Sequence, residues 1–117
     1  MKKIIIIGAT LLAAGCFLMT GCGGDAPKQT KNEIHVVTHA NWNPFEYMEN
    51  GKIVGFDVDL AREAAKRAGL TMDLTDAGWE ALFEQIRSHQ ADMAISGVTV
   101  TKDREASYLF SVPYFLS

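Results

Sequence analysis

Three short apolar runs separated by two helical patterns constrain the fold of this chain more than any other feature of its sequence. Residues 34–38, 70–75 and 93–95 are predicted to form strands, because they are rich in apolar and β-branched residues or alternate strictly between apolar and polar. Residues 57–68 and 79–89 lie between these runs and place apolar residues at helical spacing. This alternation predicts an α/β fold with a mostly parallel sheet flanked by helices.

Turn and capping residues support these boundaries. Asp57 is a candidate N-cap of the first helix, and Gly69 is a candidate stop after it. Asn50-Gly51 lies between two short apolar runs and predicts a β-hairpin. A last buried strand, or the exit from one, is expected within residues 108–115. The expected order is strand, hairpin, helix, strand, helix, strand, short helix and strand, with residues 70–75 at an edge of the sheet.

The N-terminal residues 1–21 have the pattern of a secretory signal peptide. Two lysines precede residues 4–19, an uncharged and mostly apolar run that is shorter than the about 20 residues a membrane-spanning helix needs. Cys22 follows in a segment that resembles a bacterial lipobox, which implies cleavage before this cysteine and attachment of lipid to it. Cys16 ends a competing lipobox-like segment, and a permanent membrane anchor is a further alternative. The polar residues 22–32 are predicted to be a flexible tether.

Length and composition limit residues 33–117 to one small domain. The whole chain has 117 residues, and both of its cysteines precede this segment, so no disulfide is expected within it. The formal net charge is −3, and it becomes more negative if Lys2 and Lys3 are removed with the signal peptide. An acidic domain is poorly suited to nucleic acid or to an anionic surface, so we expect no nucleic-acid partner.

Residues 96–104 have the composition of an anion-binding turn. They follow the third predicted strand with small polar residues and a glycine, and they then begin a short helix at which Thr101 is a candidate N-cap. Backbone N–H groups at a helix start attract negative charge, and Arg104 can bind a carboxylate through two parallel hydrogen bonds. We therefore expect a site for a small carboxylate. A solvated turn with an exposed arginine is the alternative for this segment taken alone.

Three loops are expected to meet at this turn. Residues 39–43, 76–79 and 96–104 each follow a strand of the predicted parallel sheet, and ligands of such folds bind beyond the carboxyl ends of the strands. Trp42 and Trp79 lie in two of these loops. Their expected proximity to the turn favours a ligand site, with simple core packing as the alternative for both tryptophans.

Several motifs occur in an order that is specific even though each motif is weak alone. They are Pro44-Phe45-Glu46-Tyr47, Gly55-Phe56-Asp57-Val58-Asp59-Leu60, Gly78-Trp79, residues 91–101 with Arg104, and residues 110–114. Together they resemble the polar amino acid branch of the bacterial extracellular solute-binding proteins of family 3, the binding components of ABC importers. The resemblance implies a type II periplasmic-binding-protein-like lobe for residues 33–117. Because family members continue through a second lobe, it also implies that the sequence covers the N-terminal part of a two-lobed clamp.

The resemblance also implies which residues bind a ligand, drawn from all three loops. They are His39, Trp42, Trp79, Ser96, Gly97, Thr99 and Arg104. Arg104 would bind the α-carboxylate of a free amino acid, and neighbouring hydroxyl and backbone groups would assist it, some of them by binding the α-ammonium group. Trp42 and Trp79 would sandwich the ligand side chain.

His39 leaves the identity of the amino acid open. Many relatives that select basic or amide side chains have an acidic residue at this position, whereas a protonated histidine would repel a cationic side chain. Residues 78–83 most resemble relatives for basic amino acids, so the two indications conflict. A basic or other polar amino acid is therefore expected, without a narrower assignment.

The implied partners are the permease and ATPase subunits of an ABC importer and, through the N-terminal lipid, the cell membrane at its extracytoplasmic face, or else the periplasm. No cofactor and no catalytic residue are expected, and no two histidines have metal-ligand spacing. Glu46, Asp57 and Asp59 are expected to be capping, structural or solvated carboxylates and not an acid/base pair. The alternatives are a catalytic relative, similar to cyclohexadienyl dehydratase or to domains that precede lytic transglycosylases, and a sensory ligand-binding domain.

Overall fold

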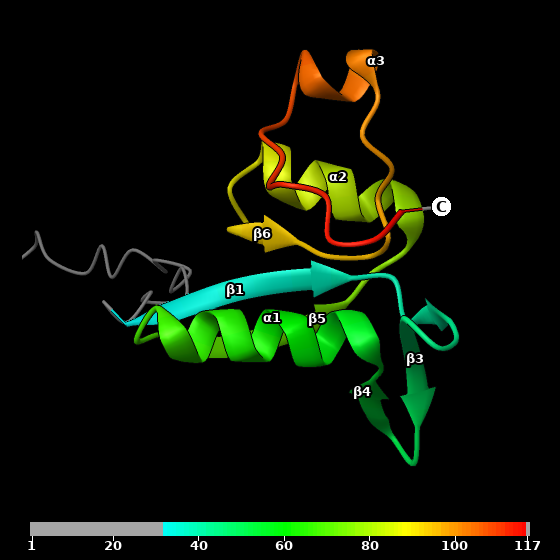
Figure 1. The fold of residues 1–117 in the computed structure, drawn as a ribbon, viewed down its shortest axis with the longest axis vertical. Helices are drawn as coiled ribbons and strands as arrows, with labels where there is room; N and C mark the ends of the chain where they lie inside the picture. The colour runs from blue at the N-terminus through cyan, green and yellow to red at the C-terminus, as the bar shows by residue number, and fades with distance from the viewer. Residues whose placement is uncertain (1–31, 117) are drawn as a thin grey trace, which may run out of the picture.

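The computed structural model describes residues 32–116, which form two small sheets and three helices. The parallel sheet has the strand order β5-β1-β6 and consists of β1 (Glu33–Thr38), β5 (Thr71–Asp76) and β6 (Met93–Ala94). The antiparallel sheet has the order β2-β3-β4 and consists of β2 (Asn41–Trp42), β3 (Glu46–Glu49) and β4 (Lys52–Val54). The helices are α1 (Phe56–Arg67), α2 (Trp79–Arg87) and α3 (Lys102–Glu105). The predicted α/β fold with a parallel sheet is confirmed (Figure 1).

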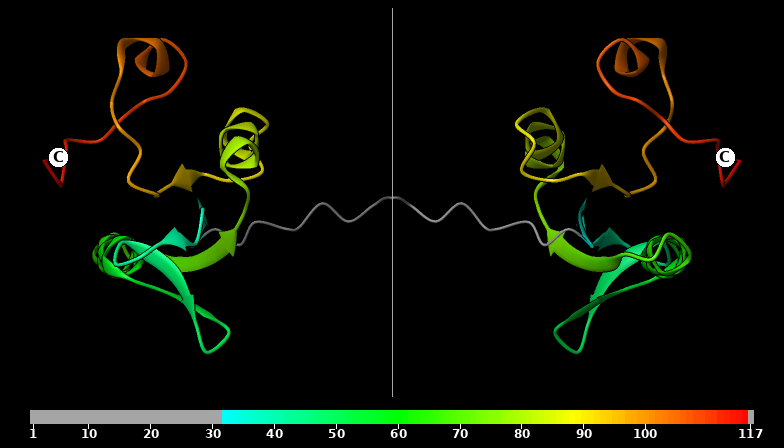
Figure 2. Two further views of the ribbon diagram at one scale, coloured as in Figure 1. Left: turned by 90° about the vertical axis from the view of Figure 1, so that its right-hand side faces the viewer. Right: turned by 90° about the vertical axis from the view of Figure 1, so that its left-hand side faces the viewer.

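β1 is the central strand of the parallel sheet, and its alternating side chains build a core on each face. Val36 packs with Ala61 of α1, whereas Val37 packs with Leu82 of α2, and all four side chains are buried. Successive side chains of a strand point to opposite faces, so α1 and α2 cover opposite faces of the sheet. Figures 1 and 2 show this layering, with the β3-β4 hairpin and α3 at opposite ends of the molecule.

The start of α1 differs from the sequence prediction. Gly55 and not Asp57 is the N-cap, and Asp57 lies inside the first turn, where its side chain is buried. The first N–H groups of the helix, those of Phe56 and Asp57, donate to the backbone carbonyls of Pro44 and Phe45 at 3.0 and 2.9 Å. The loop before the hairpin therefore satisfies N–H groups that an N-cap side chain would otherwise bind.

Residues in the left-handed region mark the turns. Asn50 and Gly51 have φ of 50° and 75° and connect β3 to β4, so the predicted hairpin is confirmed. Gly69, with φ of 73°, follows α1 as predicted. α2 ends at Arg87, two residues before its predicted end, and His89 has a φ of 59° that no α-helix contains.

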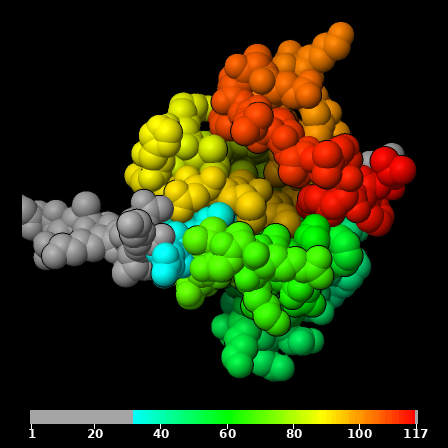
Figure 3. Space-filling model, turned by 60° about the vertical axis from the view of Figure 1, so that its left-hand side comes forward, coloured from blue at the N-terminus to red at the C-terminus, as the bar shows by residue number. Residues whose placement is uncertain are grey.

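The prediction of a last strand is wrong, because the structure contains no strand within residues 108–116. This segment runs from α2 to the start of α1 (Figure 3). There Tyr114 lies against Phe56, with ring centroids 6.2 Å apart, and Phe115 lies against Phe45 at 5.0 Å. Aromatic contacts with the junction of hairpin and helix thus hold the segment, and a run of apolar residues does not distinguish such packing from strand pairing.

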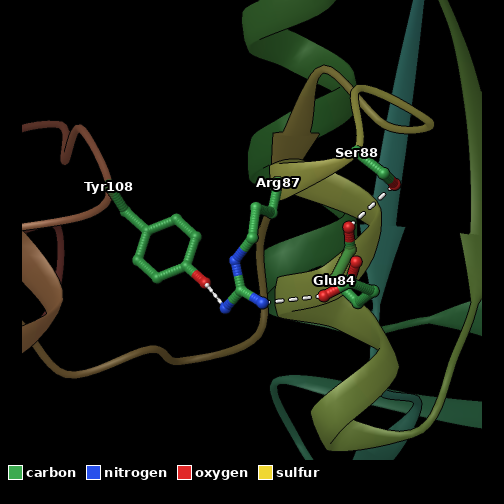
Figure 4. A network of polar contacts seen from close by, with 4 residues as sticks. All are labelled: Glu84, Arg87, Ser88 and Tyr108. Atoms are coloured by element: carbon green, nitrogen blue, oxygen red, sulfur yellow. Dashed lines mark hydrogen bonds and ion pairs between the residues drawn. The ribbon is translucent and has the colours of Figure 1, made fainter.

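The start of the same segment is bound to α2 through Tyr108. Arg87 Nη2 donates to Tyr108 Oη at 2.9 Å, and Arg87 Nη1 lies 2.8 Å from Glu84 Oε2 (Figure 4). Ser88 Oγ donates to the backbone carbonyl of Glu84 at 2.8 Å. This network lies on the exposed side of α2.

The predicted signal peptide, nearly all of the tether and the candidate lipidation site Cys22 lie outside residues 32–116. Within the part of the chain that the structure describes, no helix is long and apolar enough to cross a membrane.

Candidate functional site

The carboxyl ends of the parallel strands bring the three predicted loops together. His39 N–H donates to Ser96 Oγ at 3.2 Å, and Ala40 N–H donates to Asp76 Oδ1 at 2.8 Å, so the loop after β1 is bound to both of the others. His39 Nδ1 lies 2.9 Å from the carbonyl oxygen of Ala77. Because a carbonyl oxygen only accepts, Nδ1 carries the proton of this hydrogen bond.

Arg104 lies at the start of α3 with its guanidinium group held against two aromatic rings. Thr101 is the N-cap, as predicted, since its Oγ1 accepts Arg104 N–H at 3.3 Å. The guanidinium carbon lies 5.6 Å from the Trp79 ring centroid and 5.5 Å from that of Phe83. Arg104 Nη1 donates to the Thr99 carbonyl at 2.9 Å, and this carbonyl is the only hydrogen-bond acceptor of the guanidinium group among residues 32–116. The remaining N–H donors of the guanidinium are available for an anion.

Trp42 and Trp79 present part of their rings to solvent, with exposed fractions of 53% and 36%. Trp42 covers Gly97, which has a φ of 54°, and a Cβ at Gly97 would come within 2.6 Å of Trp42 Cζ3. Trp79 contacts Phe83 edge to face, with centroids 5.1 Å apart, and lies 6.5 Å from the His39 ring. Neither tryptophan is a fully buried core residue, so both offer aromatic surface at the edge where the loops meet.

Two buried carboxyl groups accept hydrogen bonds from the turn that follows β6. Ser96 Oγ donates to Glu46 Oε1 at 2.8 Å, and Gly97 N–H donates to Asp57 Oδ2 at 2.8 Å. Glu46 is 1% exposed and Asp57 is 0% exposed. The hydroxyl proton of Ser96 and the amide of Gly97 are therefore used within the protein, and these two residues fix the position of the turn.

Burial raises the pKa of the Glu46 carboxyl from 4.5 to about 7. The hydrogen bond from Ser96 and the interaction with His39 lower this pKa, whereas the charge of the Asp57 carboxylate raises it further. Glu46 Oε2 and Asp57 Oδ1 are buried without a hydrogen-bond partner among the described residues. A proton on Glu46 supplies a donor between these two carboxyl groups.

We expect Glu46→Gln to change how stability depends on pH. In the unfolded chain this carboxyl has a pKa near 4.5, so the folded state binds the proton more tightly. The contribution of Glu46 to the free energy of unfolding therefore falls as pH rises from about 4.5 to about 7, by up to about 3 kcal/mol in total. Glutamine keeps an N–H donor and never ionises, so the variant should gain stability relative to the parent across this window. Urea unfolding at pH 4.5 and pH 8 measures the difference, and an equal difference at both values would contradict the assignment.

No group of three or more His, Cys, Asp and Glu side chains within residues 32–116 is arranged to hold a metal ion. Glu46 and Asp57 are the two carboxyl groups nearest to the turn in the hydrogen-bond network, and both are enclosed by protein. Enclosed carboxyl groups support the position of the loop but do not reach a ligand in this conformation.

Known proteins are similar in sequence to nearly all of the part of the chain that the structure describes. A model of the bacterial extracellular solute-binding proteins, family 3, matches residues 34–117. The arginine-binding extracellular protein ArtP of Bacillus subtilis (strain 168) is 37% identical, over 98% of this chain and 45% of its own length. The chain thus spans less than half the length of this curated relative.

Solved structures with the same fold include amino-acid-binding proteins and an enzyme. The arginine-, lysine-, histidine-binding protein ArtJ from Geobacillus stearothermophilus is 51% identical with a TM-score of 0.70, over 72% of this chain and 36% of that one. The arginine-bound form of domain 1 from TmArgBP is 41% identical with a TM-score of 0.69, over 72% and 68%. An ancestral cyclohexadienyl dehydratase, AncCDT-3(P188L), is 33% identical with a TM-score of 0.68, over 72% and 35%.

Proposed function

Since the chain belongs to the bacterial extracellular solute-binding proteins of family 3, we propose that it captures a free amino acid outside the cytoplasm and delivers it to the permease and ATPase of an ABC importer. Residues 32–116 form part of one lobe of the type II periplasmic-binding-protein fold. In this fold a ligand binds beyond the carboxyl ends of the parallel strands, where the three loops meet.

The observation that carries the proposal is the placement of Arg104. Its guanidinium is held over Trp79 and Phe83 and is bound to the Thr99 carbonyl, so its orientation is fixed before a ligand arrives. The other N–H groups of the Arg104 guanidinium have no acceptor among the described residues. Two of them can donate parallel hydrogen bonds to the two oxygens of a carboxylate. Arg104 therefore binds the α-carboxylate, and Thr99 orients Arg104.

The ligand side chain lies between the exposed faces of Trp42 and Trp79, which stack well on a guanidinium or an aliphatic chain. His39 adds selectivity. Its Nδ1 proton is bound to the Ala77 carbonyl, so Nε2 of the neutral ring is an acceptor for a ligand N–H group. A basic amino acid fits these groups, and arginine is the first candidate because ArtP and ArtJ are described as binding it.

Isothermal titration of a full-length, two-lobed form of the protein against the twenty amino acids tests the function, since a part of one lobe alone should bind weakly or not at all. We expect arginine or another basic or polar amino acid to bind with measurable heat, whereas acidic amino acids should not compete. Agmatine, which is arginine without its carboxylate, should bind far more weakly than arginine. Absence of binding to all twenty amino acids, or equal affinity for agmatine and arginine, would contradict the proposed role of the carboxylate.

A catalytic role on a cyclic carboxylic acid is the second candidate, because AncCDT-3(P188L) shares the fold at 33% identity. An arginine that binds a carboxylate serves either role, but a dehydratase also needs an acid or base that reaches the substrate. Glu46 and Asp57 are enclosed and do not meet this need. Consumption of a prephenate-like acid by the purified chain would favour this second role.

Anchoring to the outer face of the membrane through lipid on Cys22 is also part of the proposal. It is supported by the lipobox-like segment and the polar residues 22–32 that follow. Fatty-acid labelling that is lost in Cys22→Ser and kept in Cys16→Ser would support this anchor, and the reverse pattern would move it to the competing segment.

A further inference from the structure

We propose that Tyr114 is a positioning residue for the ligand site, an inference that rests on the proposed amino acid binding. The Tyr114 hydroxyl donates to Asp57 Oδ2 at 2.9 Å, and the same oxygen accepts Gly97 N–H at 2.8 Å. Gly97 and Tyr114 lie 40 and 57 residues after Asp57 in the sequence. One carboxylate oxygen thus joins the start of α1, the turn after β6 and the last described segment.

Because Asp57 is fully buried, its Oδ2 atom depends on these two donors. A carboxylate that is removed from water is stable only when hydrogen bonds or nearby positive charge replace its hydration. Without the Tyr114 hydroxyl, Asp57 Oδ2 would keep Gly97 N–H as its only hydrogen-bond donor in residues 32–116. The carboxylate would then rotate or shift toward other donors, and the Gly97 amide would follow it or lose its acceptor.

Such a shift reaches the ligand site directly. Gly97 has a φ of 54°, and the Trp42 ring occupies the space in which a Cβ of Gly97 would lie, so a shift of Gly97 toward this ring would displace it. The same turn continues to Thr99, whose carbonyl orients Arg104. Both a stacking surface and the carboxylate-binding arginine therefore depend on the position of Gly97.

Tyr114 is suited to act as a permanent donor. Burial and the hydrogen bond to Asp57 raise the pKa of its hydroxyl above the ordinary value of 10, so the proton stays on the oxygen over the physiological range. Its ring packs on Phe56 at 6.2 Å, a contact that phenylalanine would keep. Figure 3 shows the segment that carries it lying against the start of α1. The substitution Tyr114→Phe therefore removes the hydrogen bond and little else.

The test compares Tyr114→Phe with Tyr108→Phe in the full-length, two-lobed form of the protein. Tyr108 is the matched control, because its hydroxyl also forms one hydrogen bond, with Arg87, but lies outside the Asp57 network (Figure 4). We expect Tyr114→Phe to weaken L-arginine binding about tenfold, the effect of one hydrogen bond to a charged group, and Tyr108→Phe to change it less than about twofold. In nitrogen-15 NMR spectra of the ligand-free protein, the chemical shift of the Gly97 amide should change in Tyr114→Phe and should stay the same in Tyr108→Phe.

The outcomes separate this inference from the proposed function. An unchanged Gly97 signal with unchanged arginine affinity in Tyr114→Phe would overturn it, as would equal losses of affinity in both variants. If the two-lobed parent protein binds no amino acid, the proposed function fails. The Gly97 signal in the ligand-free protein then decides alone whether Tyr114 positions the turn.

Discussion

Replacing Arg104 by alanine should weaken binding of the preferred amino acid at least about 100-fold. A bidentate pair between a guanidinium and a carboxylate combines two charge-assisted hydrogen bonds, each contributing about 1.5–3 kcal/mol, and 1.4 kcal/mol corresponds to a factor of ten. The unfolding midpoint should change little. Among the described residues, the Arg104 side chain forms one hydrogen bond, to the Thr99 carbonyl, and contacts with Trp79 and Phe83 that contribute about 1 kcal/mol. Titration calorimetry and thermal unfolding of the same samples measure both effects.

Two further variants define the role of Arg104. Arg62→Ala removes an exposed arginine of α1 that pairs with Asp59 at 3.2 Å, outside the three loops, and should leave affinity unchanged. Arg104→Lys keeps the charge but loses the planar pair of donors, so its affinity should lie between those of the parent and Arg104→Ala. If Arg104→Ala binds as tightly as the parent, another group holds the carboxylate and the proposed site is wrong.

The sequence predicts the architecture well because the relevant signals are local. Strand and helix periodicities identify the parallel sheet and both main helices, and Asn50-Gly51 identifies the hairpin. Parallel strands must present their carboxyl ends at one edge, so the meeting of the three loops follows from topology alone. The proximity of Arg104 to Trp79 is a direct consequence of that topology.

The buried carboxyl groups that hold the turn after β6 in place cannot be predicted from local sequence signals. Glu46 and Asp57 look like ordinary charged residues in the sequence, and their burial depends on segments 40 to 57 residues away in the chain. Asp57 occupies a position typical of an N-cap, but the carbonyls of Pro44 and Phe45 take over this task and leave its side chain free to bind Gly97. Tertiary contacts of this kind override local preferences.

Gly55→Ala should destabilise the fold by about 2–6 kcal/mol, through backbone strain and overpacking together. Gly55 has φ of 130° and ψ of 177°, a region that side-chain-bearing residues avoid at a cost of about 1–3 kcal/mol. A Cβ would also overlap the carbonyl group of Phe45 and lie 2.8 Å from the Pro44 carbonyl oxygen. These two carbonyls accept the first N–H groups of α1, so relieving the overlap breaks the bonds that start the helix. Overpacking of this kind adds about 1–3 kcal/mol.

Comparison with Gly51→Ala separates the two causes of the stability loss in Gly55→Ala, which are backbone strain and steric overlap. Gly51 also has positive φ, 75°, but nothing lies within 4 Å of its Cβ position, so its substitution should cost about 1–2 kcal/mol from backbone strain alone. Urea unfolding of both variants should therefore give a clearly larger loss for Gly55→Ala. A small domain has only a few kcal/mol of stability to lose, so Gly55→Ala should leave a large unfolded fraction even without denaturant. Equal losses in the two variants would show that the close approach of Gly55 to residues 44–45 does not limit the fold. Because Asp57 follows Gly55 by two residues, any folded Gly55→Ala protein should also bind arginine more weakly, through the displaced support of Gly97.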